Sequence, residues 1–144
     1  MKKTLATLSL TLAAGFACAQ ATPVGLWKTI DDETKAERAL VRLSDSGGVI
    51  SGRIEKLLGP DAKPDAKCDK CDDDRKDKPM VGLEIVRGAK KNEAGDAWEG
   101  GTILDAGKGK IYRLRLTPKE GGKQLEVRGY MGPFYRNQTW IRVE

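Results

Sequence analysis

Short segments in which apolar and polar residues alternate account for most of this chain, and they constrain its fold more than any other feature. The alternation is clearest in the stretches YRLRL from Tyr112 and LEVR from Leu125. A period of two places successive side chains on opposite faces of a β-strand, so each segment predicts a strand with one buried face. Eight such segments follow one another: Val24–Ile30, Ala39–Asp45, Val49–Leu58, Pro79–Lys90, Ala97–Leu104, Lys110–Thr117, Gln124–Met131 and Arg136–Val143.

Glycine-containing turns join most of these segments, for example SDSGG before Val49 and EGG before Lys123. Because short connections make sequential strands antiparallel neighbours, the segments predict a meander. A meander of eight strands hides its apolar face and both edges by closing on itself. We therefore expect an all-β fold, an eight-stranded antiparallel up-and-down barrel, with a two-sheet sandwich as the alternative. Such a barrel is just wide enough inside for side chains or one small ligand.

The chain begins with two lysines, an uncharged run over 4–18 rich in Leu and Ala, and small residues before Gln20. This order is typical of a secretory signal peptide, so we expect residues 1–19 to be cleaved and residues 20–144 to form one barrel domain. The run is shorter than the roughly 20 residues of a membrane-spanning helix, and we expect no transmembrane segment. A retained anchor and lipidation of Cys18 are the alternatives.

Cleavage removes two lysines and lowers the formal net charge of +5 by two. The remaining charges alternate in sign along the chain. A periplasmic or secreted protein is also separated from chromosomal DNA. We therefore expect no nucleic-acid partner.

One long connection, over 59–78, breaks the alternating pattern and contains AKCDKCDDDRKD from Ala66. A structural zinc site needs four Cys or His ligands, and the chain has no His and only Cys68 and Cys71 beyond the predicted signal peptide. A thioredoxin-like redox pair needs a strand-helix-strand unit and a positive field, but this loop has seven Asp against six Lys or Arg. In an oxidising compartment the pair predicts a disulfide that restrains the loop.

The absence of His also excludes Ser-His and Cys-His nucleophile pairs. Carboxylates at Asp32, Glu99 and Asp105 are the first candidates for any acid-base chemistry, but nothing in their spacing brings them together. We expect no enzyme activity, no metal and no cofactor.

The first and last predicted strands carry Gly25-Leu26-Trp27 and Trp140-Ile141-Arg142. This pattern resembles the calycins and lipocalins, in which a Gly-x-Trp closes one end of the barrel and an Arg of the last strand packs across the Trp. The resemblance implies that Gly25, Trp27 and Arg142 form the barrel closure. A guanidinium suits this place because it stacks on an indole while its donors bond nearby carbonyls.

Nearly the whole chain after residue 24 also resembles a family of exported bacterial proteins known as domain-of-unknown-function family 2147. The segments that carry this resemblance are GLWKTIDDETKAERALVRL, GRIEKLL, CDKCDDDRKDKPMVGLEI, WEGGTILDAGKGKIYRLRL, LEVRGYMG and QTWIRV. The resemblance implies the fold and export, and supplies no activity.

Two kinds of function remain. The first is a binding module for a small apolar or amphipathic ligand in a barrel lined by Ile50, Gly52, Ile54, Leu125, Val127 and Gly129; side chains alone filling the barrel is the alternative. The second is an interaction protein that engages an envelope or host macromolecule through the Cys68–Cys71 loop and the end bearing Tyr130, Phe134 and Tyr135. The candidate ligand or interface residues are Trp98, Tyr112, Arg128, Tyr130, Arg136 and Trp140.

Overall fold

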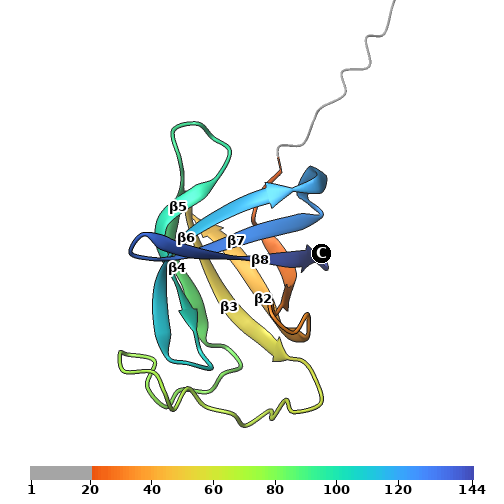
Figure 1. The fold of residues 1–144 in the computed structure, drawn as a ribbon, viewed down its shortest axis with the longest axis vertical. Coiled ribbons are helices and arrows are strands. Elements are labelled where there is room, and N and C mark those ends of the chain that lie inside the picture. The colour runs from red at the N-terminus through yellow and green to blue at the C-terminus, as the bar shows by residue number, and fades with distance from the viewer. Residues whose placement is uncertain (1–20) are drawn as a thin grey trace, which may run out of the picture.

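The computed structural model describes residues 21–144. The predicted signal peptide and Cys18 lie outside the described residues. Eight antiparallel strands close into one barrel, each paired with its neighbours in the chain and β8 with β1 (Figure 1). The strands are β1 (Gly25–Ile30), β2 (Glu37–Ser46), β3 (Val49–Leu57), β4 (Glu84–Lys91), β5 (Trp98–Asp105), β6 (Lys110–Lys119), β7 (Gln124–Met131) and β8 (Phe134–Arg142).

The prediction of an eight-stranded up-and-down barrel is therefore confirmed, and the sandwich alternative is wrong. A single 3₁₀ turn, η1 (Glu120–Gly122), lies between β6 and β7. Within residues 21–144, no helix is long and apolar enough to cross a membrane.

The start of the fourth strand differs from the prediction. Residues 79–83 are a turn, and β4 begins at Glu84. Pro79 forms an isolated bridge with Lys67, and Gly82 has a φ of +89°, which ends any extended run there. Met80 and Leu83 of this turn pack against the core, whereas Val81 is exposed.

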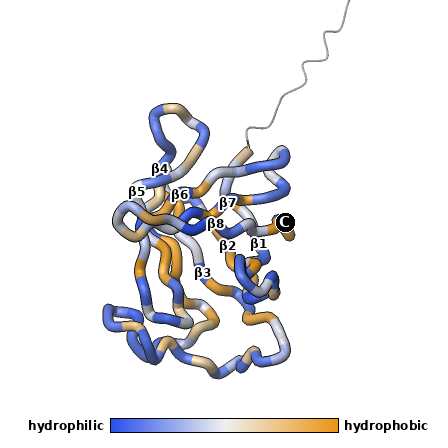
Figure 2. The backbone as a smooth tube through the Cα atoms, in the orientation of Figure 1, coloured by the Kyte–Doolittle hydropathy of each residue, from blue (hydrophilic) through white to orange (hydrophobic). Residues whose placement is uncertain are grey.

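The alternating residues place one continuous apolar layer inside the barrel. Hydropathy follows the strands, while the loops at both ends are mostly hydrophilic (Figure 2). Gly52 faces inward, where an added Cβ would overlap the side chain of Leu43 and crowd Val86. Strands β2, β3 and β4 approach closely here because the glycine has no side chain. The fully buried large side chains include Trp27, Val41, Leu43, Ile50, Val86, Leu114, Leu116, Leu125 and Trp140.

Trp27 and Arg142 pack against each other at one end of the barrel, which we call the closed end. The guanidinium carbon of Arg142 lies 4.3 Å from the centroid of the fully buried Trp27 ring. The same guanidinium donates to the backbone oxygens of Gly122, Val24 and Thr22 over 2.5 to 2.8 Å. Burial lowers the pKa of this guanidinium, and the three carbonyls compensate its lost hydration.

Candidate ligand site at the open end of the barrel

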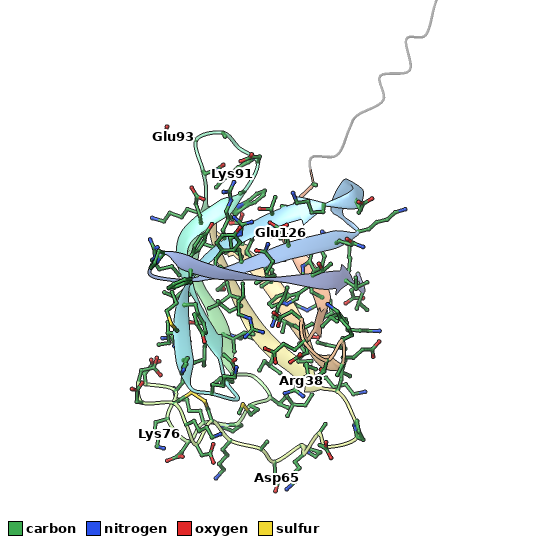
Figure 3. The ribbon with its side chains drawn as sticks, viewed as in Figure 1. Arg38, Asp65, Lys76, Lys91, Glu93 and Glu126 are labelled. Atoms are coloured by element: carbon green, nitrogen blue, oxygen red, sulfur yellow. A yellow bond between two sulfur atoms is a disulfide. The ribbon has the colours of Figure 1, made fainter. Side chains whose placement is uncertain are left out.

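The loops at the other end are the β1–β2 loop, the long loop over 58–83, the β5–β6 turn and the β7–β8 turn. Asp65 and Lys76 of the long loop project from this end, and Lys91 and Glu93 lie at the opposite one (Figure 3). We call this side of the barrel the open end.

The long loop covers part of the open end with its disulfide. Cys68 and Cys71 are bonded, as predicted, and are only 0% and 3% exposed. They belong to the barrel's own apolar core, and Sγ of Cys68 lies 3.6 Å from the carbonyl oxygen of Ala106 in the β5–β6 turn. A Cβ on Gly109 would overlap the carbonyl oxygen of Lys70, so loop and turn pack backbone to backbone. The disulfide thus faces the barrel and not the solvent.

Ion pairs fasten the same loop to β4. Arg75 is 3% exposed, pairs with Asp73 at 2.6 Å and donates to the carbonyl oxygen of Glu84 at 3.0 Å. Arg87 of β4 makes two hydrogen bonds, of 3.0 and 2.8 Å, to the carboxylate of Asp74. The hydrogen bonds from Arg87 lower the pKa of Asp74 to about 2, and those from Arg75 lower the pKa of Asp73. Both carboxylates are therefore ionised at neutral pH.

Strand register shows where the filled interior ends. Leu125 pairs with Trp140, and Val127 pairs with both Leu116 and Gln138, so these side chains share the inward face. One step further toward the open end, Gly129 pairs with Leu114 and Arg136. The inward face is buried at Leu125, Trp140, Leu116 and Leu114, half-buried at Gln138 and Gly129, and exposed at Arg136.

The next inward positions form a partly open surface. Tyr112 lies two residues from Leu114 on β6 and pairs with Ile103, and a Cβ on Gly129 would lie 3.3 Å from Cβ of Tyr112. Met131 pairs with Phe134 across the end of the β7–β8 hairpin, and both are exposed. We call this surface the mouth; it consists of Ile103, Tyr112, Met131, Phe134, Arg136 and Gln138.

The polar groups of the mouth differ in how many of their hydrogen-bonding atoms already have a partner in the protein. Oε1 of Gln138 accepts a hydrogen bond from Nε1 of Trp140 at 3.1 Å, which leaves its amide donors for other partners. The hydroxyl of Tyr112 makes no hydrogen bond within residues 21–144. A phenol and an amide next to aliphatic and aromatic side chains can hold the polar group of an amphipathic molecule.

Arg136 spans the seam where the barrel closes. The seam pairs only Trp27 with Arg142 and Lys28 with Ile141, so the first part of β8 has no ladder partner in β1. Arg136 crosses from this part of β8 to Asp32 at 2.7 Å and Glu33 at 3.1 Å in the β1–β2 loop. The Asp32 carboxylate raises the pKa of Arg136. One ion-pair cluster therefore links the two sides of the mouth.

The six candidate residues from the sequence do not form one site. Tyr112 and Arg136 belong to the mouth, and the buried Trp140 supports it from below through Gln138. Trp98 is buried on the inward face near the closed end, where Nζ of Lys91 lies 5.3 Å from its ring centroid. Arg128 and Tyr130 point to the outer face, because they alternate with inward Val127 and Gly129.

The sequence interpretation missed Ile103, Met131 and Gln138. Met131 and Gln138 lie an even number of residues from the buried Val127 and Trp140 of their own strands, so the alternation already contained the signal for their face. Ile103 lies an odd number of residues from the buried Trp98 and Leu104, and its face follows only from its pairing with Tyr112. The alternation did not indicate which of the inward positions are buried and which are exposed.

The three carboxylates considered for acid-base chemistry are separated. Asp32 pairs with Arg136, Glu99 lies on the outer face 3.7 Å from Nε of Arg115, and Asp105 accepts the backbone N–H of Lys108 in a turn. Among residues 21–144, no group of three His, Cys, Asp or Glu side chains is placed to hold a metal ion.

Two further pockets lie on the outside of the barrel, with volumes of about 290 and 300 Å³. Arg53, Val81 and Gly82 line both. Most of the charged side chains in them are already paired, as Arg53 is with Glu84 at 3.1 Å. They lie beside the long loop and add nothing to the mouth.

A family model described as "Uncharacterized protein conserved in bacteria (DUF2147)" matches residues 25–142. The chain belongs to this family. The match spans all eight strands and the long loop of this chain.

No curated protein matches the chain in sequence. Among solved structures, the chain is similar to one described as "Protein HP1028 from the human pathogen Helicobacter pylori belongs to the lipocalin family". The TM-score is 0.72 at 16% sequence identity, and the similarity covers 86% of this chain and 84% of that chain. The DUF2147 chain therefore has a lipocalin-like fold.

Proposed function

We propose that this DUF2147 protein is an exported, non-catalytic binding module that holds a small amphipathic ligand at the mouth. The observation that carries the proposal is the change along the inward face, from fully buried Leu125 and Leu116 to exposed Met131 and Phe134. An apolar surface with a few polar groups at the mouth of a β-barrel is typical of small-molecule sites.

The packed closed half limits how the ligand lies. Trp27, Trp140, Leu43 and Ile50 fill the barrel there, so the ligand occupies the open half. Its apolar part packs on Ile103, Tyr112 and Phe134. Its polar part meets the Tyr112 hydroxyl and the Gln138 amide. The ligand is therefore short or bends outward at the mouth.

Export supports the same function. The disulfide fits an oxidising compartment, and we propose that residues 1–19 direct the chain to the periplasm or out of the cell and that residues 20–144 remain. The second function, docking of a macromolecule through the cysteine loop, has less support because the disulfide is covered by the barrel.

Two tyrosines on neighbouring strands provide a matched test, because Tyr112 points into the mouth and Tyr130 points outward. The probe is 1-anilinonaphthalene-8-sulfonate, an amphipathic dye, titrated into protein recovered from the periplasm of cells that express the full chain. We expect Y112A to weaken dye binding about tenfold, the loss of roughly one buried side chain, and Y130A to leave it unchanged.

Native mass spectrometry of the same periplasmic protein then looks for a co-purified molecule. A bound small molecule present in Y130A and lost in Y112A supports the proposal. Equal dye binding by both variants, together with protein that carries no small molecule, would overturn it. Circular dichroism of each variant controls for unfolding.

A further inference from the structure

The β7–β8 hairpin ends in an exposed apolar tip. Met131, Phe134 and Tyr135 are 53%, 76% and 55% exposed, and Phe134 is the most exposed of the large hydrophobic side chains within residues 21–144. No charged residue occurs in the stretch GYMGPFY over 129–135. An exposed apolar group of this size at the end of a protruding element marks an interaction surface.

Side chains along the hairpin follow a fixed order from the tip. The first cross-strand pair is Met131 with Phe134, and the second is Tyr130 with Tyr135, whose ring centroids lie 6.0 Å apart. The fourth pair contains Arg128, three residues and therefore about 10 Å from the tip. Moving away from the tip, the hairpin is apolar, then phenolic, then cationic.

Arginines gather on the outer face behind this tip. Arg113 pairs with Tyr130 across β6 and β7, and Arg115 pairs with Arg128. The guanidinium carbon of Arg128 lies 4.2 Å from the ring centroid of Tyr135, and that of Arg113 lies 5.6 Å from the centroid of Tyr130. These cation-π contacts hold the arginines beside the phenols.

Two of these three arginines have a carboxylate within 4 Å, and neither contact is a close one. Arg113 has no carboxylate partner within residues 21–144. The carboxylates that face the group are Glu99, 3.7 Å from Arg115, and Glu126, 3.8 Å from Arg128. Both contacts are longer than the 2.7 to 2.9 Å of a charge-assisted hydrogen bond. The face therefore presents a net positive charge next to an apolar tip.

We propose that this hairpin docks the protein on an anionic phospholipid bilayer, with Met131 and Phe134 inserted and Arg113, Arg115 and Arg128 on the lipid phosphates. A bilayer has the same order of layers: hydrocarbon, then an interface where Tyr is favoured, then negative headgroups. Amphipathic elements bury about 5 to 10 Å into this boundary, which matches the spacing between the tip and Arg128. The flat surface of a protein partner would not require apolar, phenolic and cationic side chains to follow one another in this order.

The docking surface shares Met131 and Phe134 with the mouth, but its arginines and Tyr130 point to the outer face of the barrel. Vesicle binding depends on the outer arginines and tyrosines, whereas dye binding depends on Tyr112. The two proposals can therefore fail separately.

Sedimentation with vesicles tests the docking. Vesicles of one part phosphatidylglycerol to three parts phosphatidylcholine are compared with pure phosphatidylcholine, using periplasmic protein from cells that express the full chain. The variants are F134S and R113Q/R128Q. The matched controls are V81S, another exposed apolar residue, and K119Q/K123Q, two exposed lysines near the closed end.

We expect F134S to lower partitioning into anionic vesicles about tenfold and R113Q/R128Q about thirtyfold, since each arginine near an anionic surface contributes roughly fivefold. V81S and K119Q/K123Q should change it less than threefold, and Y112A should leave it unchanged. High salt should abolish most of the binding to anionic vesicles.

Equal partitioning of wild-type protein into neutral and anionic vesicles would overturn the proposal. So would equal losses in R113Q/R128Q and K119Q/K123Q, because the binding would then reflect net charge alone. Retention of wild-type protein on soluble polyphosphate or single-stranded DNA without vesicle binding would assign the face to a polyanion in solution and also overturn it.

Discussion

Arg142 shows how one residue can close a barrel end. It stacks on Trp27 and donates to three carbonyl oxygens from two chain segments, and so it joins η1 to the residues before β1. Lysine cannot reproduce this arrangement, because its ammonium is compact and lacks the planar face that stacks on an indole.

We therefore expect R142A to lower the free energy of unfolding by about 3 kcal/mol, and R142K by roughly half as much. Urea denaturation followed by tryptophan fluorescence measures both. R53K is the control, because Arg53 is exposed on the outer face and should lose less than about 0.5 kcal/mol. Equal stability of R142K and wild type would show that charge alone suffices at this position.

At the scale of an element, the long loop contributes residues to the core, among them Cys68 and Cys71. Its disulfide is buried with the barrel's apolar side chains, and it also contacts the β5–β6 turn. The cysteine spacing and the compartment were enough to predict the bond. They were not enough to predict that it is buried against the barrel, because that depends on the turn at Gly109, far away in the sequence, coming close to Lys70.

Removing the disulfide should loosen this cover without unfolding the barrel. We expect C68A/C71A to lose roughly 2 kcal/mol of unfolding free energy, most of it from the greater freedom of the unfolded loop. Hydrogen exchange of the amides over 66–80 should rise in the variant while those of β6 and β7 stay protected. Uniformly faster exchange through the barrel would contradict a local role.

The ion pair between Asp74 and Arg87 makes the loop sensitive to acid. Arg87 lowers the pKa of Asp74 from 3.8 to about 2, so the folded state favours the ionised carboxylate. Its stabilisation is fully present above about pH 4 and is lost as the pH falls through about 2. Wild type should unfold at higher urea than D74N at pH 5, and the two midpoints should converge near pH 2. A difference that stays constant over this range would contradict the assignment.

The sequence predicted the strand faces better than the strand ends. Tyr112 and Gly129 could be placed inward from alternation alone. The segment at Pro79 was wrongly predicted as strand because its apolar residues resemble one, although Gly82 turns the chain there. The contact between Arg136 and Asp32 joins residues 104 positions apart and depends on how the barrel closes, which no local pattern contains.

For the whole molecule, the eight strands close into one barrel around one continuous core, so we expect it to unfold as one unit. All three tryptophans are buried, and their fluorescence should change at the same urea concentration as the far-ultraviolet circular dichroism. Two separate midpoints would show that the open half unfolds before the tryptophan-filled half.

The seam also determines how the barrel would respond to mechanical force. β1 begins where β8 ends, and the two strands run antiparallel with only two paired positions. Pulling the ends of residues 21–144 apart would load this seam in an unzipping direction, in which bonds break one after another instead of together. Arg142, which joins the last strand to Val24 and Thr22, would be among the first contacts to carry the force. The barrel is therefore closed, but the seam between β1 and β8 offers little resistance to a force applied at the two ends of residues 21–144.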